Sequence, residues 1–506
     1  MAGCALGIPF WILAVYVGGT DVAVRILPFN VDSLRALLPE LAGWTLSGCL
    51  LGFLTQALGG IVDRIAGAES GPGGVQRPPP KNIVILGGGF AGMTTAIGLE
   101  QKLRGGQPTN VTLVSDQNAL LFTPMLAEVA GGSLEASHIS TPLRTSLHRT
   151  EFVRGRAESV DFERRVVKVS PVGGNLGTAR DIPFDHLVLA LGSVSNYFGA
   201  GNIERHSLDF KTLLDASRIR NHVIEMFERA DREPDPETRR ALLTFVVAGG
   251  GFAGVELAGA INDFSRGISA DYPTVAADEI RVLLVHSRDR ILPELSESLA
   301  TYARDRMAAR GVDFRLSTRV LDAQPGQVTL SDGVVRTQTL VWTAGTSPNP
   351  LVKSFGLETD KRGAAVVDST MAVAGRPGVW ALGDCAAVKD GVSDRACPPT
   401  AQFALRQGAT LARNIVRALK GKPAAPFHFN SLGSLCVVGH QTACAEFTIP
   451  FARNKKVRFS GLLAWMMWRG IYVSKLPGLE RKARVLLDWT FEIFFPRDIV
   501  QTIESD

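Results

Sequence analysis

The strongest constraint on the fold of this 506-residue chain is a glycine-rich turn that occurs twice. In each copy a short apolar strand leads into a GxGxxG pattern, and an amphipathic helical pattern follows. In such turns the first glycine permits the bend, the second lets the backbone approach a pyrophosphate, and the third lets the helix pack on the strand. The helix N-terminus then offers free N–H groups to the anion. The glycines are Gly87, Gly89 and Gly92 in the first copy, and Gly249, Gly251 and Gly254 in the second.

A single turn of this kind is a weak signal, because glycine-rich turns also join strands to helices without binding a ligand. Two copies in the same strand–turn–helix context predict two dinucleotide sites. One tightly held cofactor and one exchangeable cofactor would fill them, as in a flavoprotein that takes hydride from a nicotinamide. From residue 81 onward strand and helix patterns alternate. We therefore expect an α/β fold with two Rossmann-like dinucleotide-binding domains.

The order of these patterns places one nucleotide domain inside the other. We expect the first domain over residues 81–206 and again over 340–430, and the second over 207–339. Residues 431–506 would form a C-terminal region that serves the quinone and anchors the protein to a membrane with helices. Expected buried strands cover 110–114, 186–190, 281–285, 340–343 and 379–382, and an antiparallel meander is expected over 152–169.

Residues 1–65 form a hydrophobic segment that we expect to associate with a membrane. Residues 41–62 carry no charged side chain over 22 positions, which is long enough for a transmembrane helix. Residues 1–20 are also uncharged, but they are rich in glycine and contain Pro9. For them a second span, a re-entrant piece and a poor signal peptide stay open, and a buried soluble hairpin is the alternative for the whole segment. Residues 66–80 have the composition of a linker.

Charge and cysteine content narrow the class of protein further. The formal net charge is +5, and no basic block is interleaved with aromatic residues, so no nucleic-acid partner is expected. No pair of cysteines forms CxxC, which argues against a disulfide framework and favours a reducing compartment. We expect no metal site. The six cysteines are Cys4, Cys49, Cys385, Cys397, Cys436 and Cys444.

From about residue 81 the chain resembles the membrane-bound type II (alternative) NADH:quinone oxidoreductases, a family of two-dinucleotide-domain flavoproteins. The glycine turns and ALGDCA occur in many flavoproteins, whereas PPTAQ and the tryptophan-rich tail are more specific to this family. The matching segments are GGGFAG at Gly87, LLFTPMLAEVAGG at Leu120, LALGS at Leu189, GGGFAGVELAGAI at Gly249, WTAGTSPNP at Trp342, VWALGDCA at Val379, PPTAQFALRQG at Pro398 and the tail from Ser460.

The resemblance implies FAD in the first domain and NADH in the second, with NADPH left open. Hydride would pass to the flavin, and two electrons would then pass to a membrane quinone of a respiratory chain, without proton pumping. The expected location is the cell membrane, with the catalytic domains on the cytoplasmic side. The expected partners are the quinone and the lipid bilayer, and a homodimer stays open.

By this resemblance the first glycine turn, at Gly87, Gly89 and Gly92, would hold the FAD pyrophosphate. An acid is expected at the end of the following strand, where it would take a ribose hydroxyl. Here Ser115 stands at that position with Asp116 beside it. The sequence does not decide which of the two contacts the ribose.

Three more residues are expected on FAD. Gly192 ends the strand at 186–190, and Gly383 and Asp384 follow the strand in VWALGDCA. A carboxylate at Asp384 would accept hydrogen bonds from ribityl or sugar hydroxyls, and the alternative is a cap of the next helix. Cys385 is expected to be a packed residue rather than a redox thiol.

The second glycine turn would hold the nicotinamide cofactor. The acid that selects unphosphorylated NAD is absent, since His286 stands in its place with Arg288 two residues on. Arg288 could accommodate a 2′-phosphate or could be an exposed loop charge. By resemblance Glu256 lies close to the nicotinamide and flavin, and Gly345 lines the same cofactor. The alternative for Glu256 is a first-turn acid favoured by the helix dipole.

The PPTAQ segment implies a quinone site. Ala401 and Gln402 would lie beside the flavin ring where the quinone docks. Arg406 is one turn along and shares a face with Gln402, but the family usually has glutamine there. This departure leaves the details of quinone contact open.

The C-terminal tail has the properties of an interfacial membrane anchor. Arg469 and Lys475 interrupt its apolar run before the run could span a bilayer, so we expect Arg469 at the membrane edge. An ordinary core helix is the alternative. A helical stripe is expected at Val485, Leu486, Trp489 and Ile493, and headgroup contacts at Arg481, Lys482 and Arg484.

Two other functions are weighed against this one. A sulfide:quinone oxidoreductase shares the fold but needs cysteines near the flavin, and none lies between residues 81 and 384. A non-catalytic redox-sensing flavoprotein is the other alternative, and the presence of Glu256 and Gln402 argues against it.

Overall fold

The computed structural model describes residues 79–103, 108–173, 178–449 and 456–501. All of them belong to one compact unit, Pro78–Asp506. The expected span at 41–62 and most of the expected linker lie outside the described residues. Within the described ranges, no helix is long and apolar enough to cross a membrane.

The first nucleotide domain is built on a seven-stranded sheet whose central strands are apolar and buried. Parallel pairing joins β1 to β2 and β8, and β8 to β19, so two separate parts of the chain complete one sheet. The expected meander is confirmed, since β6 pairs antiparallel with both β5 and β7. In spatial order the strands are β19 (Val379–Ala381), β8 (His186–Leu189), β1 (Lys81–Leu86), β2 (Thr109–Ser115), β5 (Thr150–Asp161), β6 (Val166–Pro171) and β7 (Arg180–Pro183).

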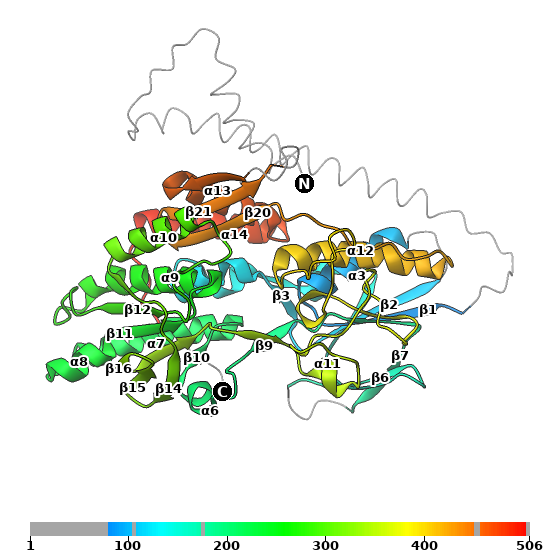
Figure 1. Ribbon diagram of the computed structural model, residues 1–506, viewed down its shortest axis with the longest axis horizontal. Helices are drawn as coiled ribbons and strands as arrows, with labels where there is room; N and C mark the ends of the chain where they lie inside the picture. Colours follow the sequence, from blue (N-terminus) through cyan, green and yellow to red (C-terminus); the bar gives the residue numbers. More distant parts are fainter. Residues whose placement is uncertain (1–78, 104–107, 174–177, 450–455, 502–506) are drawn as a thin grey trace, which may run out of the picture. The chain divides into compact units, whose positions relative to one another are not determined.

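Two helices, α3 (Phe90–Lys102) and α12 (Ala401–Leu419), lie side by side over this sheet (Figure 1). Glycines permit their close approach. A Cβ on Gly98 would lie 2.7 Å from the Cβ of Ala412, and a Cβ on Gly408 would lie 2.7 Å from the carbonyl oxygen of Ala91. The start of α12, which carries the expected quinone residues, is thereby fixed to the first glycine turn.

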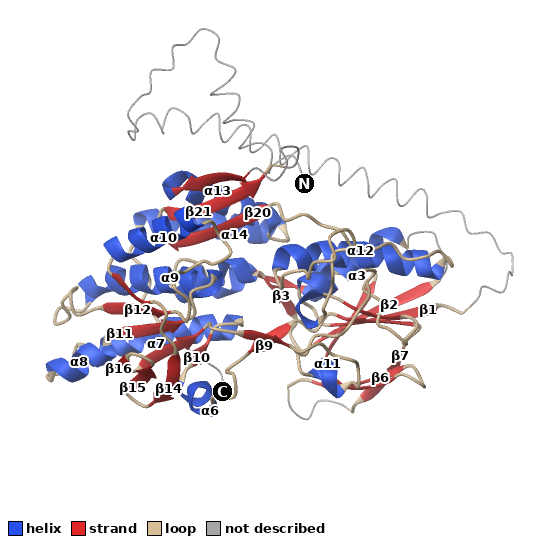
Figure 2. Cartoon of the chain, viewed as in Figure 1, coloured by secondary structure: helices blue, strands red, loops and turns tan. Residues whose placement is uncertain are grey.

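The second nucleotide domain has a five-stranded parallel sheet, visible beside the first in Figure 2. Its strands in order are β10 (Leu208–Asp209), β17 (Thr339–Trp342), β11 (Thr244–Ala248), β12 (Arg281–Val285) and β13 (Val312–Arg315). Its helices are α7 (Leu213–Ala230), α8 (Pro236–Leu242), α9 (Phe252–Ile268) and α10 (Glu297–Ala309). A separate antiparallel sheet shares an apolar cluster with this parallel sheet. Its strands are β14 (Val320–Gln324), β15 (Gln327–Leu330) and β16 (Gly333–Arg336).

The five strands of the second sheet all lie between β8 and β19 of the first sheet in the sequence, and the elements at both ends of this stretch extend beyond the boundaries expected at 206 and 340. The helix α6 (Gly201–His206) buries Ile203 among strand residues of the second sheet. The strand β17 pairs in parallel with β11, so it also belongs to the second domain. The chain crosses between domains at an antiparallel pair, β9 (Ser193–Ser195) and β18 (Thr346–Pro348).

The C-terminal region contains a three-stranded antiparallel sheet that the sequence did not predict. Its strands are β20 (Gly433–Gly439), β21 (Thr442–Thr448) and β22 (Lys456–Ser460), and the helices α13 (Gly461–Lys475) and α14 (Leu479–Phe494) follow. Trp468, Val485 and Trp489 are buried in the same apolar cluster as α9, so this region packs on the second domain. The remaining elements are β3 (Ala119–Leu121), η1 (Thr123–Met125), α4 (Leu126–Ala130), η2 (Ala136–Ile139), β4 (Ser140–Pro142), α5 (Leu143–Ser146), η3 (Ser269–Asp271), α11 (Leu351–Ser354) and η4 (Gly383–Cys385).

Candidate active site

The first glycine turn has the shape that a pyrophosphate requires. Gly87 has a φ of +111°, and a Cβ there would lie 2.1 Å from the carbonyl oxygen of Ala190. A Cβ on Gly92 would lie 1.9 Å from the carbonyl oxygen of Gly87, so α3 packs directly on the turn. No atom lies within 4 Å of a Cβ built on Gly89. Gly89 is the N-cap of α3, and neither a capping side chain nor a first-turn acid occupies its free N–H groups.

The second turn repeats this geometry. Gly249 has a φ of +121°, and a Cβ on Gly254 would lie 1.9 Å from the carbonyl oxygen of Gly249. Nothing lies within 4 Å of a Cβ on Gly251, which is the uncapped N-cap of α9. Both turns therefore fit a dinucleotide, because each leaves open space in front of the N–H groups that start a helix.

Ser115 and His286 occupy equivalent places beside the two turns. A Cβ on Gly88 would lie 2.9 Å from Ser115 Oγ, and a Cβ on Gly250 would lie 2.6 Å from His286 Cγ. The carboxylate of Asp116 instead lies 3.5 Å from the guanidinium of Arg156. Of the two residues that the sequence left open, Ser115 is the one that faces the turn.

The ring of His286 is held in one tautomer. The backbone N–H of Gly250 donates to Nδ1 at 3.0 Å, so Nε2 carries the proton of the neutral ring. This Nε2 is buried and has no hydrogen-bond partner among the described residues. Burial lowers the pKa of His286, and the nearby charge of Arg288 lowers it further. Arg288 itself is exposed.

Asp384 is held by a chain of hydrogen bonds rather than acting as a helix cap. The Oδ2 atom of Asp384 accepts a hydrogen bond from Ser193 Oγ at 2.8 Å. The same Ser193 Oγ accepts a hydrogen bond from Lys211 Nζ at 2.8 Å. Burial lowers the pKa of Lys211, and the charges of Asp384 and Asp209 oppose this. Neither Ser193 nor Lys211 could be recognised as a partner of Asp384 from the sequence, because each lies far from it along the chain.

Two glycines leave room beside Asp384. Gly383 has a φ of +73° and Gly192 a φ of +69°, and no atom lies within 4 Å of a Cβ on Gly192. The N–H of Gly383 donates to Oε1 of Gln407 at 2.8 Å, which ties this turn to α12. Cys385 is fully buried, and burial raises the pKa of its thiol to about 11, as expected for a packed residue.

One cavity places Asp384 next to the start of α12. It is lined by Gly383, Asp384, Thr400, Phe403 and Gln407, among others. Thr400 is the N-cap of α12 and makes no side-chain capping bond. Ala401 and Gln402, the first two residues of that helix, are half-buried.

The strand β20 touches both expected catalytic side chains. Gln402 Oε1 accepts from the N–H of Leu432 at 3.3 Å, and its Nε2 donates to the carbonyl oxygen of Gly433 at 3.5 Å. Four residues on, the N–H of Val437 donates to Oε1 of Glu256 at 3.2 Å. The C-terminal region thus links the start of α12 to the start of α9.

Glu256 lies in the second turn of α9, so the alternative of a first-turn acid is wrong. Burial raises the pKa of its carboxyl to about 8, the hydrogen bond from Val437 opposes this rise, and the charge of Glu128 adds to it. Gly345 lies where the chain crosses between domains, and a Cβ there would lie 2.7 Å from the ring of Phe198.

Comparisons with known proteins match both parts of this architecture. Residues 81–408 match the pyridine nucleotide-disulphide oxidoreductase family, and residues 431–498 match the NDH2 C-terminal domain. The type II NADH:quinone oxidoreductase Ndh of Mycobacterium tuberculosis is 31% identical over 82% of this chain and 88% of its own length. The chain belongs to the type II NADH:quinone oxidoreductase family.

Two further comparisons agree with this membership. A probable NADH dehydrogenase of Dictyostelium discoideum is 32% identical over 77% of this chain and 85% of its own length. The structure of NDH2 from Plasmodium falciparum in complex with NADH has a TM-score of 0.75 and covers 83% of this chain and 99% of its own. Its sequence identity is 17%, so this likeness concerns the fold alone.

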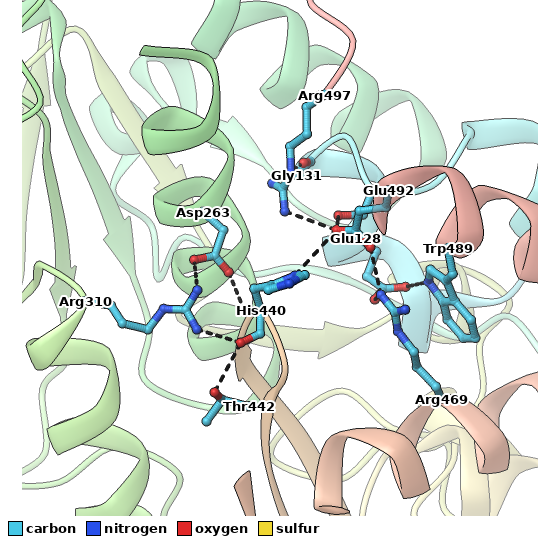
Figure 3. A network of polar contacts seen from close by, with 11 residues as sticks. Glu128, Gly131, Asp263, Arg310, His440, Thr442, Arg469, Trp489, Glu492 and Arg497 are labelled. Atoms are coloured by element: carbon cyan, nitrogen blue, oxygen red, sulfur yellow. Dashed lines mark hydrogen bonds and ion pairs between the residues drawn. The ribbon is translucent and has the colours of Figure 1, made fainter. Parts of the chain in front are cut away.

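In this member of the family, Arg469 is not at a membrane edge as expected but inside the protein. Its guanidinium lies 2.8 Å from the carboxylate of Glu492 and 3.9 Å from that of Glu128 (Figure 3). It also stacks over the rings of Trp465 and Trp489, with its Cζ at 3.8 and 4.4 Å from their centroids. An arginine within an apolar run is compatible with a membrane edge and with an internal ion pair. Here two acids that are distant in the sequence, Glu128 and Glu492, pair with it inside the protein.

The expected stripe on α14 is also split. Val485 and Trp489 are buried in the protein, whereas Leu486 and Ile493 are exposed. The side chains of Arg481 and Lys482 donate to the backbone carbonyls of Ser137 and Ser474. Only part of this helix is therefore available to another surface.

Proposed function

We propose that this chain oxidises NADH and passes the electrons through FAD to a membrane quinone. The observation that carries the proposal is the contact of β20 with both Glu256 and Gln402. Glu256 lies near the start of α9 in the nicotinamide domain, and Gln402 lies at the start of α12 in the FAD domain. A hydride donor and a quinone would therefore reach the flavin from adjoining elements.

In this proposal the first turn holds the FAD pyrophosphate at the open backbone of Gly89, with Ser115 beside the ribose. Asp384, fixed by Ser193, accepts hydrogen bonds from hydroxyls of the cofactor. FAD, when bound, supplies a hydride acceptor that can also give up electrons, and the chain orients both substrates around it. Glu256 contacts the nicotinamide side, and Ala401 and Gln402 contact the quinone.

Sulfur chemistry fits the structure less well. A sulfide:quinone oxidoreductase would need reactive thiols at the flavin, and thiolates are the reactive species. Cys436 lies on β20 beside Val437, which contacts Glu256, but burial raises the pKa of this thiol well above the ordinary value. Cys444, its register partner on β21, is also buried, with a pKa raised to about 12.

The proposed function is tested by NADH oxidation in membranes that contain the protein, with a water-soluble quinone as acceptor. We expect quinone-dependent oxidation that follows the amount of bound FAD. Flavin that is reduced by neither NADH nor NADPH would instead support a non-catalytic role. Sulfide-dependent quinone reduction without NADH would support the sulfide alternative.

Selection of the nicotinamide is proposed to depend on His286. The buried N–H at its Nε2 can donate to a ribose hydroxyl or to a 2′-phosphate, and no carboxylate repels the phosphate. We expect NADH to be used and NADPH to be tolerated, and His286→Glu to shift the ratio of kcat/KM towards NADH by about tenfold, or about 1.4 kcal/mol. Steady-state kinetics with both cofactors measure this. If the parent already rejects NADPH strongly and the ratio does not move, selectivity lies elsewhere.

We also propose that α13 and α14 bind the cytoplasmic face of the membrane without crossing it. Large apolar side chains on these helices are exposed, including Leu487, Phe491 and Phe494 at 55%, 56% and 74%. Burial of each in lipid would contribute about 1.5–3 kcal/mol.

The double substitution Phe491→Glu and Phe494→Glu is therefore expected to reduce co-sedimentation with anionic phospholipid vesicles more than tenfold. FAD content should stay unchanged. Val334→Glu, at an exposed apolar residue of β16, is the matched control. Equal vesicle binding by the double variant and the control would contradict lipid contact at this face.

A further inference from the structure

A second buried carboxyl shares a cavity with Glu256. The cavity is lined by residues of α4, α9, β20, α13 and α14, and Glu128 and Glu256 both belong to its lining. The indole Nε1 of Trp468 in the same lining is buried and has no hydrogen-bond partner among the described residues. The lining of this cavity therefore contains two carboxyls that can be protonated.

The cation nearest Glu128 is already paired with another acid. Arg469 lies 2.8 Å from Glu492, and Arg497 lies 3.2 Å from the same carboxylate, whereas Arg469 is 3.9 Å from Glu128 (Figure 3). The two arginines help to hold the pKa of Glu492 below its ordinary value. Glu128 receives one direct hydrogen bond in this cluster, from Nε1 of Trp489 at 2.9 Å.

Because both arginines lie closer to Glu492 than Arg469 lies to Glu128, Glu128 is able to hold a proton near neutral pH. Burial raises its pKa to about 7, the charge of Glu492 adds to the rise, and Arg469, Trp489 and Arg497 oppose it. Glu256 is affected in turn, because a charged Glu128 raises its pKa. The two carboxyls are thus coupled, and ionising one favours a proton on the other.

The cavity also has a polar edge nearer to solvent. His440 belongs to its lining, keeps 40% of its side chain exposed, and lies 4.0 Å from Glu492. Asp263, another lining residue, accepts the backbone N–H of His440. Tyr472 and Cys436 face Glu256, and the pKa of each is raised, so both stay neutral.

The proposed reaction needs one proton from solvent. Oxidation of NADH transfers a hydride, which carries two electrons and one proton, and reduction of a quinone to a quinol takes two electrons and two protons. We propose that Glu128 and Glu256 form a proton-loading pair, which takes one solvent proton through this cavity in each turnover. Glu256 then releases this proton to the quinone as the quinone takes up two electrons, and the other proton of the quinol is the one that the hydride carried. The inference rests on the proposed function, and Glu128 acts on the reaction only through Glu256.

The test is Glu128→Gln in the full-length holoenzyme. Glutamine keeps the acceptor for Trp489 but cannot titrate. The matched control is Glu135→Gln, an exposed acid that follows α4 in the chain. Stopped-flow should show reduction of the flavin by NADH within about twofold of the parent. Its reoxidation by quinone should slow by about tenfold or more below pH 7, and the decline of the rate near that pH should be lost.

A second readout needs no turnover. The pKa of Glu128 is higher in the folded protein than in the unfolded chain, so its stabilising contribution is present at acid pH and is lost as pH rises through about 7. The difference in Tm between Glu128→Gln and the parent should therefore increase from pH 5 to pH 8, and that for Glu135→Gln should stay constant. A merely structural, permanently ionised Glu128 would give no such increase.

Either a parental pH profile in Glu128→Gln or a Tm difference that does not increase with pH overturns the proposal. Failure of the proposed function is distinguishable, because it would be seen in the parent itself as a lack of quinone reduction. Failure of the proton route is seen only when the variant is compared with the parent.

Discussion

Gly89→Ala is expected to give a folded protein that has lost most of its FAD. The backbone of Gly89 has a φ of −74° and a ψ of −169°, which alanine adopts easily, and no atom lies within 4 Å of the added Cβ. The methyl group would stand where the pyrophosphate approaches the helix N-terminus. Overpacking costs about 1–3 kcal/mol, and weakened hydrogen bonds to a charged group cost about 1.5–3 kcal/mol. Together these lower FAD affinity by about a hundredfold or more.

The flavin-to-protein absorbance ratio and a circular dichroism spectrum of the purified variant measure this loss. Gly251→Ala is the matched control, because that glycine has the same open position in the second turn. It should keep FAD and lose affinity for NADH. Gly92→Ala should fail to fold, since its Cβ would lie 1.9 Å from a backbone oxygen. Full FAD occupancy in Gly89→Ala would show that the cofactor lies elsewhere.

Gln402→Ala is expected to slow reoxidation of the flavin by quinone by about tenfold to a hundredfold, or about 1.4–2.7 kcal/mol. The side chain would both contact the quinone and hold residues 431–433, to which it makes its hydrogen bonds. Reduction of the flavin by NADH should change little, because the contact between Glu256 and Val437 does not involve Gln402.

Anaerobic stopped-flow separates these two half-reactions. Arg413→Gln is a control on the same helix, at an exposed position about three turns further on. It should leave both rates close to those of the parent. If Gln402→Ala impairs both half-reactions equally, or only the first, Gln402 has no specific part in quinone reduction.

The parts of the fold that local chemistry specifies could be predicted from the sequence. The two glycine turns carry strand, bend and helix within about twenty residues, so their pattern predicts a complete unit. The position of Asp384 after a buried strand was equally local. The expected domain boundary at 340 was misplaced because the apolar composition of Thr339–Trp342 does not indicate which of the two sheets this strand joins.

The parts that depend on distant partners could not be predicted. Glu128 lies in a short apolar helix, and the residues that set its charge state come from α13, α14 and the segment that follows α14. Lys211 and Ser193 reach Asp384 only because the domain crossing brings them together. Arg469 was assigned to the membrane edge for the same reason, since its partner Glu492 cannot be recognised from the pattern around either residue.

The most direct test of the account is an anaerobic titration of the purified holoenzyme, first with NADH and then with a quinone. One equivalent of NADH per flavin should bleach the flavin absorbance, and one equivalent of quinone should then restore it with formation of one equivalent of quinol. A flavin that NADH does not bleach, or one that stays bleached in the presence of quinone, would contradict the transfer of electrons from nicotinamide to quinone in this protein.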